Sequence, residues 1–180
     1  MDAPAPLSPD IRRIVVLGST GSGKTTLAAA LAERLGLPHV EIDALHWLPG
    51  WEHLSDEDLR ARIEAATRPA GWVLDGNYGV ARDVSWPRAQ AVVWLDYPFW
   101  TVFRRLLRRT IRRTLKRELL WGVNTERFRA QFLSRDSLFL WLLKTYWRRK
   151  RQYPALFARP EYAHLEIHRF RRPAEAEAWL

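Results

Sequence analysis

Near its start the chain carries the stretch Ile14-Val15-Val16-Leu17-Gly18-Ser19-Thr20-Gly21-Ser22-Gly23-Lys24-Thr25-Thr26. Its first four residues are apolar and mostly β-branched, which predicts a buried parallel strand. Residues 18–25 then match the pattern G-x-x-x-x-G-K-[ST]. Apolar residues recur at helical spacing from Leu27 to Leu35, which predicts a helix ending at Gly36.

This strand, loop and helix have the chemistry of a phosphate-binding loop (P-loop). Glycines let consecutive backbone N–H groups curl around phosphate oxygens, and the helix N-terminus adds partial positive charge. We expect Lys24 to reach the β and γ phosphates of ATP and Thr25 to hold Mg²⁺ through its hydroxyl. A glycine-rich turn without a ligand is the alternative, and the flanking elements argue against it. The residues expected to bind ATP are Gly18, Ser19, Thr20, Gly21, Ser22, Gly23, Lys24, Thr25 and Thr26.

Two carboxylates follow predicted strands. Asp75 comes after Trp72-Val73-Leu74, and Asp96 ends the run that starts at Ala91. Because ligands of open α/β sheets bind outside the carboxyl ends of the strands, either Asp could face the phosphates. Each could instead cap the turn that follows it. Only one needs to touch the metal, and we predict Asp75.

A third carboxylate, Asp43, follows the short predicted strand Val40-Glu41-Ile42. An Asp at this edge could orient or deprotonate an acceptor hydroxyl, as phosphoryl transfer requires. The alternative is a helix N-cap. The nearby His46 stands beside Trp47, which is more typical of a packed side chain than of a catalyst.

Composition excludes several classes of protein. The chain has 180 residues, of which 47% are hydrophobic and 27% charged, which is typical of one globular domain. The absence of Cys excludes a disulfide framework, a thiolate zinc site and a cysteine nucleophile. No basic and apolar leader and no membrane-length apolar run are present, so we expect a soluble, cytoplasmic protein.

The positive charge belongs to one segment. Residues 99–153 hold 16 of the 29 Lys and Arg and 3 of the 20 acidic residues, which gives this segment a charge of +13. Arg105 and Arg109 are four residues apart, so they share a helix face and could approach a polyphosphate together. Each could also be an ordinary surface charge. Charge alone does not distinguish a nucleotide, nucleic acid or anionic lipid as partner, although the apolar stripe of this helix argues against a membrane.

Aromatic residues are interleaved with these basic ones. They could stack bases of single-stranded nucleic acid, but their helical spacing with Leu138 and Leu142 favours packing inside the fold. The residues concerned are Trp121, Trp141, Tyr146 and Trp147.

Strands and helices alternate along the chain, which predicts a parallel sheet covered on both faces. We expect one domain over residues 1–180, with 99–153 as a basic helical segment within it. Further helices are predicted near 55–66, 101–117, 126–133 and 137–153, a last strand at 164–168, and a final helix opening at Pro173.

Taken together, these motifs resemble the small P-loop kinases of the nucleoside monophosphate kinase superfamily, in an adenylate-kinase-like pattern. The resemblance rests on residues 18–25, on Leu74-Asp75-Gly76, and on Leu95-Asp96-Tyr97-Pro98 followed by Arg105 and Arg109. It implies a three-layer α/β P-loop NTPase fold with a five-stranded parallel sheet in the order 2-3-1-4-5. It also implies that residues 99–153 form a lid.

The same resemblance implies roles for single residues. Arg105 and Arg109 match arginines that contact ATP phosphates at the lid entrance of adenylate kinases. Asp43 stands where shikimate kinases place an Asp that binds the metal and the acceptor, and Arg169 falls in the stretch expected beside the adenine.

A nearer resemblance, from Ile11 onward, is to bacterial proteins described as adenylate-kinase-like or DNA topology modulation proteins. It rests on Trp47-Leu48-Pro49-Gly50-Trp51, on Glu118-Leu119-Leu120-Trp121-Gly122 and on residues 164–172. Adenylate kinases follow their third strand with Pro and an AMP-binding Arg, whereas this chain has Asn77-Tyr78-Gly79, so AMP is not the predicted acceptor. Arg82 or Arg88 could substitute for that Arg.

We therefore expect ATP- and Mg²⁺-dependent phosphoryl transfer to a small acceptor. The rival interpretation is a nucleic-acid-associated ATP-binding protein that uses residues 99–153 to contact the phosphate backbone.

Overall fold

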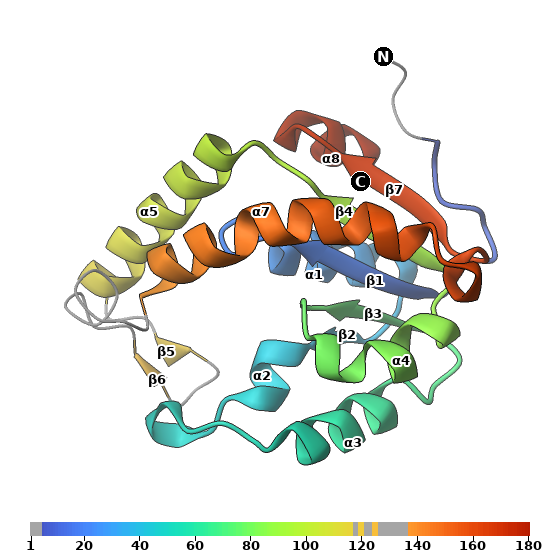
Figure 1. The fold of residues 1–180 in the computed structure, drawn as a ribbon, viewed down its shortest axis with the longest axis horizontal. Helices are drawn as coiled ribbons and strands as arrows, with labels where there is room; N and C mark the ends of the chain where they lie inside the picture. Colours follow the sequence, from blue (N-terminus) through green and yellow to red (C-terminus); the bar gives the residue numbers. More distant parts are fainter. Residues whose placement is uncertain (1–4, 117–118, 121–123, 126–136) are drawn as a thin grey trace.

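The computed structural model describes residues 5–116, 119–120, 124–125 and 137–180 of the chain. Five parallel strands form its main sheet, in the order β2-β3-β1-β4-β7 (Figure 1). This is the predicted order 2-3-1-4-5, because β7 is the fifth strand of that sheet. The strands are β1 (Arg13–Gly18), β2 (His39–Glu41), β3 (Trp72–Asp75), β4 (Ala91–Leu95) and β7 (Glu166–Phe170), and a separate antiparallel pair joins β5 (Leu119–Leu120) to β6 (Asn124–Thr125).

Helices connect the strands and cover the sheet. The α-helices are α1 (Lys24–Leu35), α2 (Ile42–His46), α3 (Asp56–Ala66), α4 (Arg82–Ser85), α5 (Phe99–Lys116), α7 (Leu138–Phe157) and α8 (Pro173–Trp179). Short 3₁₀ turns are η1 (Pro49–Trp51), η2 (Gly79–Ala81), η3 (Trp86–Arg88) and η4 (Pro160–Tyr162).

The apolar run of β1 is buried on both sides because helices cover both faces of the sheet. Ile14 and Val16 belong to one core cluster, which includes residues of α1, α5 and α8. The alternate residues Val15 and Leu17 belong to a second cluster, with residues of α3 on the other face. The chain thus has the three-layer α/β fold of P-loop NTPases.

Helix α7 contributes to both clusters. Leu142 and Tyr146 in its first half pack in the first cluster, whereas Tyr153 and Leu156 in its second half pack in the second. Figure 1 shows α7 running across the front of the sheet. This helix therefore lies near the strand ends where the P-loop begins.

Several predicted boundaries move. The strand predicted over residues 40–42 is one over 39–41, because Ile42 already begins α2. The last strand starts two residues later than predicted, since the Leu165 N–H closes a turn onto the Tyr162 carbonyl before pairing begins. Helix α7 continues past Pro154 to Phe157. The predicted helix 126–133 lies outside the described residues.

Candidate active site

The P-loop connects β1 to α1 in the conformation that its glycines require. Gly21 and Gly23 have φ angles of 81° and 92°, in the left-handed region, and Gly23 is the N-cap of α1. The Ser22 N–H donates to the Ser19 carbonyl at 3.0 Å, which curls the chain. Ser22 is buried, Lys24 and Thr25 are partly buried in the first turn of α1, and Thr26 is exposed. This is a loop whose backbone N–H groups can surround an anion at a helix N-terminus.

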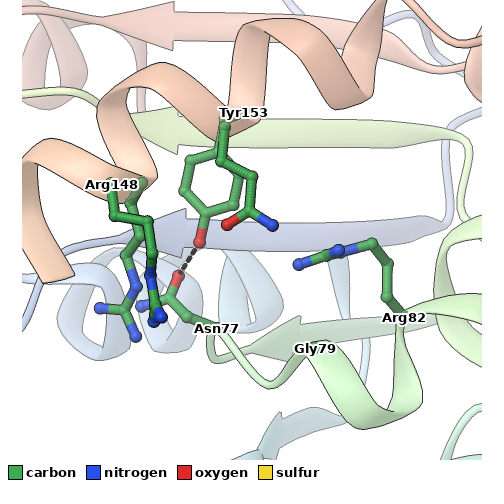
Figure 2. Close-up of a pocket in the computed structure, with 7 residues that line it drawn as sticks. Asn77, Gly79, Arg82, Arg148 and Tyr153 are labelled. Atoms are coloured by element: carbon green, nitrogen blue, oxygen red, sulfur yellow. Dashed lines mark hydrogen bonds between the residues drawn. The ribbon is translucent and has the colours of Figure 1, made fainter.

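Asn77, just after β3, holds the first glycine of this loop. Its side-chain Oδ1 accepts the Gly18 N–H at 3.2 Å, and its Nδ2 donates to the Gly18 carbonyl at 2.5 Å. The Tyr153 hydroxyl, from α7, also donates to Asn77 Oδ1, at 2.9 Å (Figure 2). Sequence reasoning missed the contact of Asn77 with Gly18, because nothing local to Asn77 indicates a partner 59 residues away.

Of the two carboxylates left open by the sequence, Asp75 is the one beside the P-loop. The Thr25 hydroxyl donates to Asp75 Oδ1 at 3.3 Å, and Asp75 is 1% exposed. His39 Nε2, another residue that the sequence did not point to, lies 3.1 Å from Asp75 Oδ2. This arrangement holds the Asp75 carboxylate in one orientation, toward the start of α1.

A hydroxyl and a carboxylate this close fit Mg²⁺, which takes oxygen ligands and is usually held by one or two protein groups with water and phosphate oxygens. No group of three or more His, Asp or Glu able to hold a metal is found in the part of the chain that the structure describes. By their oxygen chemistry and their contact with each other, Thr25 and Asp75 are the residues that would hold Mg²⁺.

Asp96 is engaged elsewhere. Its Oδ2 accepts from Arg169 Nη2 at 2.5 Å, and its Oδ1 lies 3.4 Å from Lys150 Nζ. The Arg169 guanidinium also lies over the Trp94 ring, 4.4 Å from its centroid. In this structure Arg169, which the resemblance placed beside adenine, is fixed by a carboxylate and an indole at the end of β4.

Helix α5 lies directly against the P-loop. A Cβ on Gly21 would stand 2.8 Å from Leu106 Cβ, and one on Gly23 would stand 3.1 Å from Arg105 Nη2. Arg109 Nη2 reaches Thr20 Oγ1 at 3.5 Å. The structure thus brings both predicted arginines to the loop.

Asp43 lies in the first turn of α2 rather than at a strand end. Its Oδ1 accepts the Tyr78 hydroxyl at 2.7 Å, and burial, followed by the charge of Asp43, raises the pKa of Tyr78 above its ordinary value. The His46 ring packs against Tyr78 at 5.0 Å and stacks on His53 at 5.3 Å. His46 is a packed side chain, as its sequence context indicated.

The aromatic residues that are interleaved with the basic ones differ in their exposure to solvent. Tyr146 is buried and its hydroxyl donates to the Tyr97 carbonyl at 2.9 Å. Trp141 and Trp147 are 49% and 55% exposed. Burial inside the fold is thus confirmed for Tyr146, whereas Trp147 contacts the Tyr146 and Phe99 rings from a half-exposed position. Trp121 lies outside the described residues.

Comparisons with known proteins agree with this fold. A family model described as "ATPase family associated with various cellular activities (AAA)" matches residues 14–96, which include the P-loop and Asp75. No curated protein sequence matches the chain significantly. Among the described residues, no helix has both the length and the apolar character needed to cross a membrane.

Solved structures of similar fold include kinases of small molecules. A shikimate kinase from Bacteroides thetaiotaomicron has a TM-score of 0.55 and 19% identity, over 94% of each chain. A gluconokinase from Sinorhizobium meliloti 1021 has a TM-score of 0.53 and 21% identity, over 94% of this chain and 91% of that one. A shikimate kinase from Acinetobacter baumannii in complex with shikimate has a TM-score of 0.54 and 20% identity, over 94% of this chain and 89% of that one.

Proposed function

We propose that the protein transfers the γ-phosphoryl group of ATP to a small-molecule acceptor, with Mg²⁺. The observation that carries this proposal is that α5 brings Arg105 and Arg109 to a P-loop whose Thr25 contacts Asp75. Phosphoryl transfer depends on positioning and on cationic groups around the phosphates, and this arrangement supplies both. The kinases of similar fold support the same class of reaction.

In this proposal the residues act on the two substrates as follows. Lys24 and the loop backbone bind the ATP phosphates, and Arg105 and Arg109 neutralise charge on the transferring group. Asp43 orients the acceptor hydroxyl. Mg²⁺, when bound, would screen the charge of the phosphates.

The finer assignment follows the sequence resemblance. We propose a single cytoplasmic domain of the adenylate-kinase-like group, related to the proteins described as DNA topology modulation proteins. Residues 99–153 would form its lid and exclude water during transfer. Asn77 supports an acceptor other than AMP, because this residue binds the P-loop backbone at the place where adenylate kinases continue toward an AMP-binding Arg.

The test is release of ADP from ATP and Mg²⁺ in the presence of candidate acceptors. The panel contains nucleoside monophosphates, nucleosides, sugars and hydroxy acids, and Lys24→Ala is the blank. We expect one acceptor class to raise the rate well above the rate without acceptor, and Lys24→Ala to abolish it with the fold intact. Full activity in Lys24→Ala, or a flat panel, would overturn the proposal.

Asp43 is tested with the acceptor found in that panel. We expect Asp43→Asn to lower the rate of transfer strongly and to leave ATP binding nearly unchanged, because Asp43 contacts Tyr78 and not the P-loop. Tyr78→Phe is the control, since it removes only the hydroxyl that positions the carboxylate. Equal losses of transfer and of ATP binding in Asp43→Asn would contradict its role.

A second candidate function is binding of nucleic acid beside ATP. It is favoured by the exposure of Trp141 and Trp147 on α7, among the exposed basic residues Lys144 and Arg148. If the segment docks on a phosphate backbone, the logarithm of the binding constant for DNA should fall linearly with the logarithm of the salt concentration. If the segment is only a lid, little DNA should bind at physiological salt. A titration of single-stranded DNA at several salt concentrations separates the two.

A further inference from the structure

A cationic pocket of about 230 Å³ lies beside the site described above (Figure 2). It is lined by Asn77, Gly79, Arg82, Arg148, Arg149, Gln152 and Tyr153. Arg82 enters it from α4, after β3, and Arg148 and Arg149 enter it from α7. Two parts of the chain that are far apart in sequence thus direct three guanidinium groups toward one small space.

These three arginines have no acidic partner among the residues that the structure describes. Within the described part of the chain, no carboxylate lies within ion-pair distance of Arg82, Arg148 or Arg149, and the pocket lining contains no acid. The Asp83 carboxylate, next to Arg82 in sequence, is paired with Arg60. The pocket therefore holds positive charge that nothing in its lining balances.

Two of these arginines, Arg82 and Arg149, lie over aromatic rings. The Arg82 guanidinium lies over the Trp86 ring, 5.1 Å from its centroid, and the Arg149 guanidinium lies 5.9 Å from that of Trp141. Burial, and less strongly the charge of Arg148, lowers the pKa of Arg149. A bound anion would relieve this repulsion, and guanidinium groups bind carboxylates and phosphates through paired hydrogen bonds.

The pocket joins both halves of the candidate site. Asn77 lines it and also holds Gly18, the first residue of the P-loop. On its other side, Tyr78, the residue after Asn77, donates its hydroxyl to Asp43 at 2.7 Å, and, against the larger effect of burial, the charge of Asp43 raises the pKa of Arg149. An anion in the pocket would thus lie between the phosphate-binding loop and the carboxylate expected to hold an acceptor hydroxyl.

We propose that Arg82, Arg148 and Arg149 bind the anionic group, a phosphate or a carboxylate, of a small hydroxylated acceptor. This inference rests on the proposed function for the identity of the ligand as acceptor. Pockets for drug-sized ligands measure about 300–1,000 Å³, so this pocket suits one oxyanion and a few further atoms. The three arginines act here on the acceptor, apart from Arg105 and Arg109, which contact the P-loop.

Calorimetric titration of the full chain at constant ionic strength tests the proposal directly. The probes are glycerol 3-phosphate, glycerate and neutral glycerol, which share a hydroxylated three-carbon body and differ in their anionic group. Arg82→Gln and Arg149→Gln each remove one charge, and Arg148→Gln does so at an exposed position where folding is not at risk. Arg34→Gln, at the exposed end of α1, is the matched control.

We expect at least one anionic probe to bind and glycerol not to bind. Each pocket substitution should weaken binding about tenfold or more, the usual effect of a lost hydrogen bond between charged groups, and Arg34→Gln should leave it unchanged. Preference for glycerol 3-phosphate assigns the ligand group as phosphate, and preference for glycerate assigns it as carboxylate.

Lys24→Ala separates this pocket from the P-loop, which also binds anions. Binding that survives Lys24→Ala and is lost in the arginine variants supports the pocket, even if no acceptor supports ADP release and the proposed function fails. Binding that is lost in Lys24→Ala but kept in the arginine variants would overturn the inference, as would equal binding of glycerol or no binding of either anion.

Discussion

Asn77 joins three parts of the molecule through one amide group, namely the loop after β3, the P-loop and α7. Replacing it with Ala leaves the Gly18 N–H and carbonyl without these partners in a partly buried place. We expect Asn77→Ala to lower the free energy of unfolding by about 1–3 kcal/mol and to raise the KM for ATP. Urea unfolding and ADP-release kinetics measure the two effects.

Tyr153→Phe is the matched control for Asn77→Ala. It removes one hydrogen bond to Asn77 and leaves both bonds to Gly18, so it should cost about 1 kcal/mol and change the KM for ATP little. A larger effect on the KM in Tyr153→Phe than in Asn77→Ala would show that Asn77 does not act through the P-loop.

His46 gives the protein a pH-dependent contribution to stability. Burial and the neighbouring His53 lower the pKa of His46 below 6.5, against the opposing charges of Asp43 and Asp56. The unfolded chain then binds more protons than the native one below pH 6.5, so stability falls as the pH drops from this value toward the lower native pKa. We expect His46→Gln to show a smaller loss of stability than the natural chain between about pH 7.5 and 5.5.

Urea unfolding at these two pH values makes this measurement. His164→Gln is the control, because that histidine is exposed. An equal loss of stability on acidification in His46→Gln and in the natural chain would contradict the assignment.

At the scale of the elements, a Gly→Ala substitution, which adds one methyl group, can test the contact of α5 with the P-loop. Ala at position 21 meets both a positive φ of 81° and the Leu106 side chain, whereas Ala at position 36 meets a φ of 62° and no atom within 4 Å. Gly36→Ala thus reports backbone strain alone, of about 1 kcal/mol. We expect Gly21→Ala to lower the free energy of unfolding by about 1–3 kcal/mol more, the usual cost of overpacking, and to reduce ADP release because α5 and its arginines shift.

Urea unfolding and ADP release compare the two variants. Equal stability of Gly21→Ala and Gly36→Ala would mean that α5 does not press on the loop.

The sequence predicted best the elements whose signals are local. The β-branched run of β1, the glycines of the P-loop and the Ser55 cap of α3 act within a few residues, and the structure has each of them. The boundaries that moved depend on distant packing. Ile42, for example, begins α2 because it is buried against Gly76, and the short run Val40-Glu41-Ile42 does not reveal this.

In the candidate site, too, the residues placed by local motifs were predicted and those placed by distant contacts were not. Asp75 ends β3 and Thr25 follows the loop at the end of β1, so parallel-sheet topology alone indicates that they meet. The pairs His39–Asp75 and Asn77–Gly18, and the cluster of Arg82 with Arg149, join residues dozens of positions apart through side-chain orientation. Periodicity and motif spacing contain no information on such contacts.

At the scale of the whole molecule, α7 contributes residues to both core clusters. Adjacent leucines on this helix therefore differ in burial. Leu142 is 0% exposed and packs in the first cluster, whereas Leu143 is 50% exposed. We expect Leu142→Ala to lower the free energy of unfolding by about 2–5 kcal/mol, the usual cost of a core cavity. Leu143→Ala should stay within about 0.5 kcal/mol.

Leu156→Ala extends this test to the second cluster, where Leu156 is 3% exposed. If α7 is anchored at both ends, Leu142→Ala and Leu156→Ala should each reduce stability in one cooperative transition, which fluorescence and circular dichroism should report at the same urea concentration. Any lid motion would then be confined to the part of segment 99–153 that precedes α7. An early, separate transition in Leu142→Ala, with Leu156→Ala still cooperative, would instead show that the first half of α7 opens together with the lid.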